Sequence, residues 1–145
     1  MSTVLVLNGP NLGRLGTREP DIYGSRTLDD LRAFLVEEAG DTVIDLRQTD
    51  NEGELLGWLH EAADDATPVI LNAGAWTHYS YALHDAVSLA TTAGATVIEV
   101  HISNPHAREQ FRHTSVVSAV ATGVIAGFGF DSYRLALDHI RRNSA

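Results

Sequence analysis

Residues Thr3–Gly24 read TVLVLNGPNLGRLGTREPDIYG, an apolar run followed by a long polar segment. The apolar run, Thr3–Asn8, has the composition of a short strand that is buried on both faces. The next amphipathic pattern begins only near Thr27, so the connection is several times longer than the usual ~4–6 residues. Connections of this length are usually functional or disordered, and this one contains two arginines and a tyrosine.

Four more valine- and isoleucine-rich runs alternate with helical patterns along the chain, which is typical of an α/β protein. We expect them to be strands buried on both faces, at Thr42–Arg47, Pro68–Asn72, Thr96–His101 and Ala121–Ala126. The helical patterns are Leu28–Ala39, Glu52–Ala63, Tyr79–Ala93 and Ser132–Arg142, with a short piece near Arg108. Five strands with short crossovers predict one domain over residues 1–145, with a parallel sheet and helices on both faces.

Helix start and stop signals support these ranges. Thr27 is a plausible N-cap, and so is Asn51, which has Glu54 three residues later as a capping box. Gly40 and Gly94 follow helical patterns and predict C-terminal stops, because glycine adopts the left-handed conformation that commonly ends a helix.

The chain is acidic, but its arginines are unevenly placed. A net charge of −9 argues against nucleic acid or an anionic membrane as a partner, because neutralising phosphates requires a positive face. Arg14 and Arg18 share the long connection, however, and Arg108 and Arg112 share a second loop-like region. Local positive charge in an acidic protein predicts a small anionic ligand.

Two residue types are missing, and each absence excludes a kind of chemistry. Without cysteine the chain has no disulfide, thiolate nucleophile or zinc–thiolate site, which fits a reducing compartment. All ten basic residues are arginine, so no lysine can form a Schiff base. No run approaches the ~18 apolar residues of a membrane span, and no secretory leader is recognisable. We therefore expect a soluble, unprocessed, cytoplasmic protein.

Polar residues close three of the predicted strands. Asn8 ends the first, Asn72 the third and His101 the fourth. In an open parallel sheet, ligands bind beyond the carboxyl ends of the strands where the strand order reverses. If the order is 2-1-3-4-5, these three residues surround one crevice, and the long connection leaves from its rim as a lid.

Other motifs argue against several functions. The segment GPNLGRLG has neither the GxGxxG spacing of a dinucleotide site nor the GK[ST] ending of a P-loop. His101, His106 and His113 have no HExxH motif or carboxylate-rich triad near them, so we expect no metal. The absence of a GxSxG elbow speaks against a hydrolase of the usual α/β kind.

Four segments carry a resemblance to a known family. They are NGPNLGRLGTREPDIYG at Asn8–Gly24, EGEL at Glu52–Leu55, LNAGAWTH at Leu71–His78 and EVHISNPHAREQFRH at Glu99–His113. In order and spacing they resemble type II 3-dehydroquinate dehydratase, from about Val4 to Leu137. The resemblance implies a flavodoxin-like sheet of order 2-1-3-4-5 and a dodecamer built as a tetramer of trimers. It also implies dehydration of 3-dehydroquinate to 3-dehydroshikimate, in the shikimate pathway or in quinate catabolism, without a cofactor.

Such a dehydration needs a base that removes the proton beside the ketone, and the resemblance implies Tyr23. A free tyrosine with a pKa of ~10 is only about 0.1% ionised at neutral pH, so a positive neighbour is required. Arg18 is the implied neighbour, and Arg108 adds to the field. The alternative is a tyrosine that packs on the loop beside solvated arginines.

The resemblance implies that His101 is the general acid that protonates the leaving hydroxyl. Glu99 lies two residues earlier, on the same face of the strand, where its carboxylate can orient and charge the imidazole. Asn11 resembles the residue that holds a water against the enolate oxygen. Alternatively, His101 is a core histidine with satisfied hydrogen bonds, and Asn11 caps a turn after Pro10.

Substrate-binding roles are also implied by the resemblance. They fall on Asn72 and the backbone N–H groups of Ile102 and Ser103 for the carboxylate, and on His78 and Arg112 for the ring hydroxyls. Arg112 could otherwise be a surface side chain, and Asn72 a strand-end turn former.

Asp85 is implied to complete the site of a neighbouring subunit. Counted along one helix, it lies seven residues beyond His78, about 10.5 Å along the axis, too far to serve the same site easily. Three residues depart from the family pattern: Trp76, Tyr79 and His84. They replace no catalytic role, but they could alter the trimer contact or substrate affinity.

Two other classes of function stay open. A flavodoxin-like module for FMN or a nucleotide would need a phosphate loop, which the sequence lacks. A catalytically silent assembly protein would have no need of the intact set of Asn11, Arg18, Tyr23, Glu99 and His101.

Overall fold

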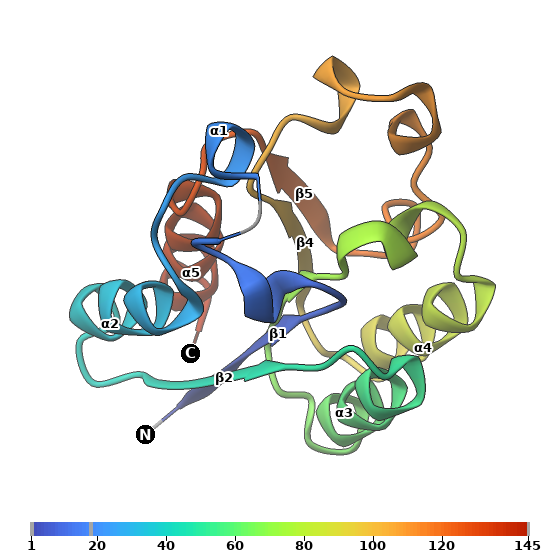
Figure 1. Ribbon diagram of the computed structural model, residues 1–145. Coiled ribbons are helices and arrows are strands. Elements are labelled where there is room, and N and C mark those ends of the chain that lie inside the picture. The colour runs from blue at the N-terminus through green and yellow to red at the C-terminus, as the bar shows by residue number, and fades with distance from the viewer. Residues whose placement is uncertain (1, 18, 145) are drawn as a thin grey trace.

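A computed structural model of the chain describes residues 2–17 and 19–144 and contains a five-stranded parallel sheet of order β2-β1-β3-β4-β5 (Figure 1). The strands are β1 (Thr3–Asn8), β2 (Val43–Gln48), β3 (Val69–Asn72), β4 (Val97–His101) and β5 (Gly123–Ala126). The longer helices are α2 (Leu28–Glu38), α3 (Glu52–Asp65), α4 (Tyr81–Thr92) and α5 (Asp131–Arg142). The predicted flavodoxin-like α/β architecture and its strand order are confirmed.

The helices cover the sheet in two pairs, with α2 and α5 on one face and α3 and α4 on the other (Figure 1). Successive residues of a strand point to opposite faces, and β1 uses both. Val4 and Val6 pack in the cluster that contains α2 and α5, whereas Leu5 and Leu7 pack in the cluster of α3 and α4. This is why Val4, Leu5, Val6 and Leu7 are consecutive apolar residues in this central strand.

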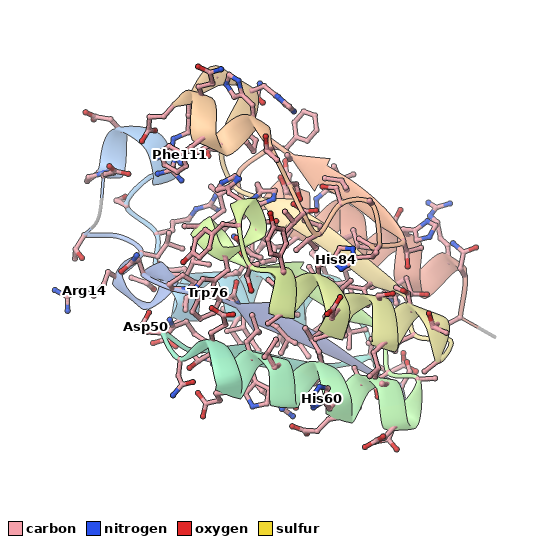
Figure 2. The ribbon with its side chains drawn as sticks, turned by 90° about the vertical axis from the view of Figure 1, so that its right-hand side faces the viewer. Arg14, Asp50, His60, Trp76, His84 and Phe111 are labelled. Carbon is pink, nitrogen blue, oxygen red and sulfur yellow. The ribbon has the colours of Figure 1, made fainter. Side chains whose placement is uncertain are left out.

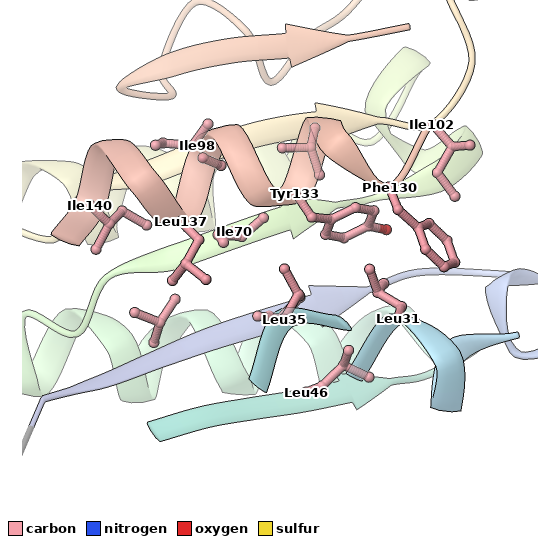
Figure 3. Close-up of a cluster of buried hydrophobic side chains, with 14 of the residues drawn as sticks. Leu31, Leu35, Leu46, Ile70, Ile98, Ile102, Phe130, Tyr133, Leu137 and Ile140 are labelled. Atoms are coloured by element: carbon pink, nitrogen blue, oxygen red, sulfur yellow. The ribbon is translucent and has the colours of Figure 1, made fainter. Parts of the chain in front are cut away.

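The layer under α2 and α5 is a continuous apolar cluster (Figure 3). Leu31 and Leu35 of α2 and Tyr133 and Leu137 of α5 are buried in it, together with Ile70 of β3. Burying one such side chain contributes roughly 1.5–3 kcal/mol to folding. The cluster therefore fixes α5 against the sheet and brings the polar end of Tyr133 toward the strand ends.

The two edge strands differ from the prediction that all strands are buried on both faces. Val43 of β2 is 40% exposed and Val124 of β5 is 48% exposed. β2 pairs only with β1, and β5 pairs only with β4. The helix pairs cover the middle of the sheet most completely, so the apolar composition of these two runs overstated their burial.

One of the two predicted helix starts is as expected, and the other differs in detail. Thr27 and Asp30 form a complete capping box at the start of α2. The Asn51 side chain accepts from the Glu54 N–H, as predicted, but the Asn51 N–H donates to Thr49 Oγ1 instead of to Glu54. The predicted capping box at Asn51 is therefore wrong, because the preceding threonine hydroxyl satisfies the donor.

The long connection after β1 is partly ordered by packing. It contains two short helices, η1 (Leu12–Arg14) and α1 (Pro20–Tyr23). Leu12 and Leu15 are buried in the cluster under α2 and α5, whereas residues 19–21 and 24–27 are exposed. The first half of the connection is thus anchored on the core. In the second half, Glu19 lies 3.5 Å from Arg108, and the Arg26 guanidinium lies 4.0 Å from the centroid of the Phe130 ring. The predicted lid stays a proposal.

Among the described residues, no helix combines the length and apolar character needed to cross a membrane.

Candidate active site

A hollow lies at the carboxyl ends of the central strands, where β1, β3 and β4 pass into loops. It brings together seven of the predicted site residues, which are Asn11, Asn72, His78, His101, Ile102, Ser103 and Arg112. Arg108 joins them in the lining, and no aspartate or glutamate among the described residues does. A concave site with two guanidinium groups and no acidic lining suits an anionic ligand.

Glu99 and His101 form the most buried charged contact of the site. Glu99 Oε2 lies 2.5 Å from His101 Nε2 at the end of β4. Glu99 is only 1% exposed, and the side chain of His101 is 11% exposed. The contact expected from their spacing on one face of the strand is present. Because the carboxylate holds Nε2, the imidazole has a fixed orientation at the edge of the hollow.

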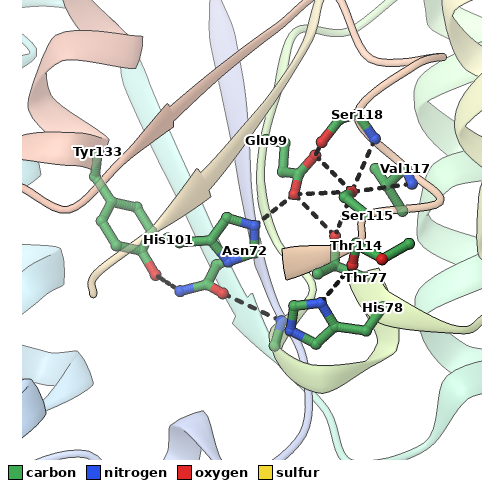
Figure 4. A network of polar contacts seen from close by, with 11 residues as sticks. Asn72, Thr77, His78, Glu99, His101, Thr114, Ser115, Val117, Ser118 and Tyr133 are labelled. Atoms are coloured by element: carbon green, nitrogen blue, oxygen red, sulfur yellow. Dashed lines mark hydrogen bonds and ion pairs between the residues drawn. The ribbon is translucent and has the colours of Figure 1, made fainter. Parts of the chain in front are cut away.

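Three hydroxyl groups surround the Glu99 carboxylate (Figure 4). Thr77 Oγ1 donates to Oε2 at 2.9 Å, and Ser118 Oγ donates to Oε1 at 2.6 Å. Ser115 Oγ lies 3.3 Å from both oxygens, and it accepts from the backbone N–H groups of residues 117 and 118. We call Thr77, Ser115 and Ser118 the hydroxyl cradle. Sequence reasoning missed all three, because no spacing signal shows that these loops converge on Glu99.

The cradle keeps a buried carboxyl ionised. Burial by itself raises the pKa of Glu99, because it penalises the charged form. The hydrogen bond and charge of His101 and the hydroxyls of Ser118 and Thr77 outweigh burial, so the pKa ends below its ordinary value. A negative charge thus lies beside the His101 imidazole, 2.5 Å from its Nε2.

His78 has the opposite electrostatic environment. Its Nδ1 donates to the carbonyl oxygen of Thr114 at 2.7 Å, since a carbonyl can only accept. Burial lowers the pKa of His78, and the positive charges of His101 and Arg112 add to this. A neutral imidazole with Nδ1–H engaged leaves Nε2 as a hydrogen-bond acceptor, which suits a ligand hydroxyl.

The loop after β4 supplies the two arginines and contains two short helices, η3 (Pro105–Ala107) and η4 (Gln110–His113). Arg108 donates to Ser103 Oγ at 3.2 Å and lies 3.5 Å from Glu19 of the long connection. Arg112 donates to Glu109 Oε1 at 3.0 Å, and its guanidinium lies over the ring of Phe111 at 4.6 Å. Both arginines are therefore held by neighbours rather than solvated.

Asn11 occupies the N-cap position of η1, with a left-handed φ of 68°. Its side chain makes no cap hydrogen bond, whereas its backbone N–H donates to Asp50 Oδ1 at 2.8 Å. The alternative that Asn11 caps a turn is thus correct for its backbone position only, and the side-chain amide belongs to the lining of the hollow.

Asn8 does not reach the hollow, although the prediction placed it there with Asn72 and His101. It is opposite Asn72 in the β1–β3 register but is fully buried. The phenol of Tyr133 lies between these two asparagines and is hydrogen-bonded to both. Figure 4 shows the bond to Asn72. Tyr133 was also missed from the sequence, because it lies 61 residues from Asn72 and reads as an ordinary buried position of α5.

Asp85 lies away from the hollow and is exposed on α4, 3.0 Å from His84 Nδ1. The prediction that it does not share the site of its own chain holds for the described residues. Its stated reason is wrong, because His78 and Asp85 do not belong to one helix. His78 ends the short helix η2 (Gly74–His78), and α4 begins at Tyr81 after a turn. A role in the site of another subunit stays a prediction.

The two residues implied as the catalytic base and its charged neighbour cannot be placed. Arg18 lies outside the described residues, and only the backbone of Tyr23 is described, at the end of α1. Their roles stay predictions.

The three departures from the family pattern lie in different surroundings. Trp76 is buried against Gly9, whose missing Cβ leaves room for the ring and for the Ala73 carbonyl, which an added Cβ would approach to 2.6 Å. Tyr79 is 61% exposed, and His84 lies on the outer face of α4 (Figure 2). Trp76 therefore belongs to the buried cluster of α3 and α4, whereas the other two residues are accessible to solvent.

The remaining histidines form no metal site among the described residues. The His106 and His113 rings are 5.7 Å apart on the loop after β4, and neither lines the hollow. No group of three described His, Cys, Asp or Glu side chains is arranged to hold a metal ion.

Comparison with known proteins gives a consistent result. The family model described as dehydroquinase class II matches residues 2–141. A 3-dehydroquinate dehydratase from Salinispora tropica is 60% identical over 140 residues, covering 94% of this chain and 95% of that protein. The type II dehydroquinase structure from Propionibacterium acnes has a TM-score of 0.94 at 53% identity, covering 99% of this chain and 98% of that one. That from Butyrivibrio crossotus has a TM-score of 0.90 at 38% identity, covering 97% of both. The chain belongs to the class II dehydroquinase family.

Proposed function

We propose that this chain dehydrates 3-dehydroquinate, the substrate in the names of its relatives, to 3-dehydroshikimate through an enolate intermediate. The reaction breaks a carbon–hydrogen bond beside the ketone and then the carbon–oxygen bond of a hydroxyl group. One proton is taken up by a base, and another is given to the departing hydroxyl, which leaves as water. The site must therefore supply a base, an acid and donors for the enolate oxygen.

The Glu99–His101 pair is the observation that carries the proposal. The carboxylate is buried, ionised and 2.5 Å from the imidazole, which opens into a hollow with two arginines in its lining. His101 is the general acid in this mechanism, and Glu99 holds its imidazole in place. The base is Tyr23, with Arg18 favouring the phenolate, and these two assignments rest on the family motif.

The other lining residues bind the substrate and the enolate. Asn11 holds a water against the enolate oxygen. Asn72 and the backbone N–H groups of Ile102 and Ser103 bind the carboxylate. A second set binds the ring hydroxyls, with neutral His78 as acceptor and Arg112 as donor.

Several wider assignments belong to the same proposal. Residues 1–145 act as one catalytic domain in the cytoplasm, without a cofactor. Trimers assemble into a dodecamer, in which Asp85 completes the site of a neighbouring subunit. The exposed position of Asp85 outside the hollow of its own chain supports this arrangement.

The test is the ultraviolet absorbance of the conjugated product after 3-dehydroquinate is added to the purified protein. We expect turnover by the wild type and a loss of more than about 100-fold in kcat for His101→Ala, as is typical when a general acid is removed. His60→Ala is the matched control, because His60 lies on the outer face of α3 (Figure 2), and it should retain wild-type turnover. Absence of product with the folded wild-type protein would refute the proposed function.

A further inference from the structure

Three buried side chains, Asn8, Tyr133 and Asn72, link the backbone of β2 to the candidate active site. Figure 4 shows the Tyr133–Asn72 part of this link. Asn8 Nδ2 donates to the Arg47 carbonyl oxygen at 3.1 Å, and Tyr133 Oη donates to Asn8 Oδ1 at 2.7 Å. Asn72 Nδ2 donates to Tyr133 Oη at 2.8 Å, and the Gly74 N–H donates to Asn72 Oδ1 at 3.2 Å. All three side chains are at most 3% exposed, so solvent does not compete for these bonds.

Backbone groups at the two ends of this chain of hydrogen bonds dictate its direction. The Arg47 carbonyl can only accept, so Asn8 must turn its nitrogen there and its oxygen to Tyr133. The phenol hydrogen is then used on Asn8, and the phenol oxygen is left to accept from Asn72. At the other end, the Gly74 N–H can only donate, which independently requires the oxygen of Asn72. Both ends impose the same orientation on the Asn72 amide.

This orientation decides what Asn72 can offer a ligand. Its oxygen is engaged by Gly74, and one of its two nitrogen-bound hydrogens is engaged by Tyr133. The second hydrogen has no partner among the described residues, and Asn72 lines the hollow. We propose that Tyr133 is a positioning residue that makes Asn72 a hydrogen-bond donor toward the substrate carboxylate. The inference rests on the proposed function, which supplies the carboxylate.

The protonation state and the packing of Tyr133 both suit this role. Burial raises the pKa of the phenol, so it stays protonated and keeps donating to Asn8 at neutral pH. The ring is held by α5 and by an edge contact with Phe130, whose centroid is 6.5 Å away. Phenylalanine would fill the same space but would lack the hydroxyl group that donates to Asn8 and accepts from Asn72.

The test is a double-mutant cycle between Tyr133→Phe and Asn72→Ala, read from KM for 3-dehydroquinate and from the Kd of 3-dehydroshikimate. Loss of one well-placed hydrogen bond corresponds to about a tenfold change. We expect Tyr133→Phe to raise both constants about tenfold, with kcat and its pH profile little changed. In the Asn72→Ala background, Tyr133→Phe should raise KM and Kd by less than a further factor of about two. Tyr81→Phe removes an exposed phenol and should change neither constant.

Several outcomes would overturn the inference. One is that folded Tyr133→Phe has an unchanged KM and an unchanged Kd. If only its melting temperature falls, Tyr133 has a structural role and does not position Asn72. Another is a full tenfold effect added to that of Asn72→Ala, because Tyr133 would then act by another route. If Tyr133→Phe does not fold, Asn8→Ala serves instead. It frees the phenol hydrogen to turn toward Asn72 and should also raise Kd. If the wild-type protein shows no turnover, the proposed function is refuted. The role of Tyr133 can still be tested, because the Kd of 3-dehydroshikimate is measured without turnover.

Discussion

Glu99 Oε2 lies 2.5 Å from His101 Nε2, and five hydrogen-bond contacts from one imidazole and three hydroxyls converge on this carboxylate. A carboxylate so enclosed would be neutral in an apolar site, because burial raises its pKa. Here the partners, His101 first, lower the pKa of Glu99 below its ordinary value. The carboxylate therefore accepts the hydrogen of His101 Nε2 and fixes the orientation of the imidazole at the candidate active site.

The lowered pKa of Glu99 makes a prediction about stability against pH. A carboxyl with a depressed folded-state pKa stabilises the fold above its unfolded pKa and loses this contribution as the pH falls through the folded value. We expect Glu99→Gln to lower the free energy of unfolding by about 1–3 kcal/mol at pH 7. The difference from the wild type should shrink below pH 4.5. Urea unfolding at several pH values measures it, and a difference that grows in acid would contradict the prediction.

The hydroxyl cradle should tune the acid strength of His101. Thr77→Val removes a donor that lies 2.9 Å from the carboxylate, which makes the Glu99–His101 pair more basic. We expect the alkaline limb of the kcat profile to move to higher pH by about one unit, with kcat several-fold lower and KM little changed.

Two further variants make this test specific. Thr91→Val deletes another partly buried threonine hydroxyl, which donates to backbone carbonyls and not to Glu99, so its profile should match the wild type. Thr77→Ser retains a hydroxyl and should restore most of the profile. An alkaline limb that does not move in Thr77→Val would mean that the cradle has only a structural role.

The proposed lid predicts protection from proteolysis. Pro10, Asn11 and Leu12 line the hollow, so a ligand there should hold the connection after β1 in place. Trypsin should cut at Arg14 or Arg18 in the free protein, and 3-dehydroshikimate should slow this cleavage several-fold. Cleavage at exposed Arg142 is the internal reference and should keep its rate. Identical cleavage of the connection with and without ligand would mean that it does not close.

The proposed assembly predicts complementation between two variants that each lack one native residue of the shared site. Asp85→Ala should raise KM about tenfold without changing the pH profile that reports His101. Asp64→Ala is the control, because Asp64 lines the same surface depression as Asp85 and has no assigned role. Mixing Asp85→Ala with Tyr23→Phe subunits should restore some activity by forming sites with both native residues. No recovery after verified subunit exchange would contradict a shared site.

The sequence predicted the sheet because the central strands bury both faces, and such strands have an unmistakable apolar composition. It predicted the contact of Glu99 with His101 because the two-residue period of a strand is independent of tertiary context. It failed where a contact depends on loops or on another layer. The partners of Glu99 at Thr77, in η2, and Ser118, in a loop, lie about 20 residues away on either side of it, and no local pattern marks their convergence.

Two predicted helix starts differ from the structure for local reasons. The Asn51 N–H was assigned to Glu54, but a nearer hydroxyl on Thr49 satisfies it. The helix expected from Tyr79 begins at Tyr81 because Ser80 caps it, with its hydroxyl accepting from Leu83. In each case a side chain outside the apolar pattern decides where the regular structure begins.

The most direct test of the proposed mechanism is the turnover of Tyr23→Phe, measured by product absorbance together with the affinity for 3-dehydroshikimate. An interaction made only in the transition state lowers kcat and kcat/KM together and leaves binding intact. We expect Tyr23→Phe to lose at least about 1,000-fold in kcat, with a Kd for 3-dehydroshikimate within about threefold of the wild type. Near-normal turnover by this variant would remove tyrosine from the role of base and contradict the mechanism.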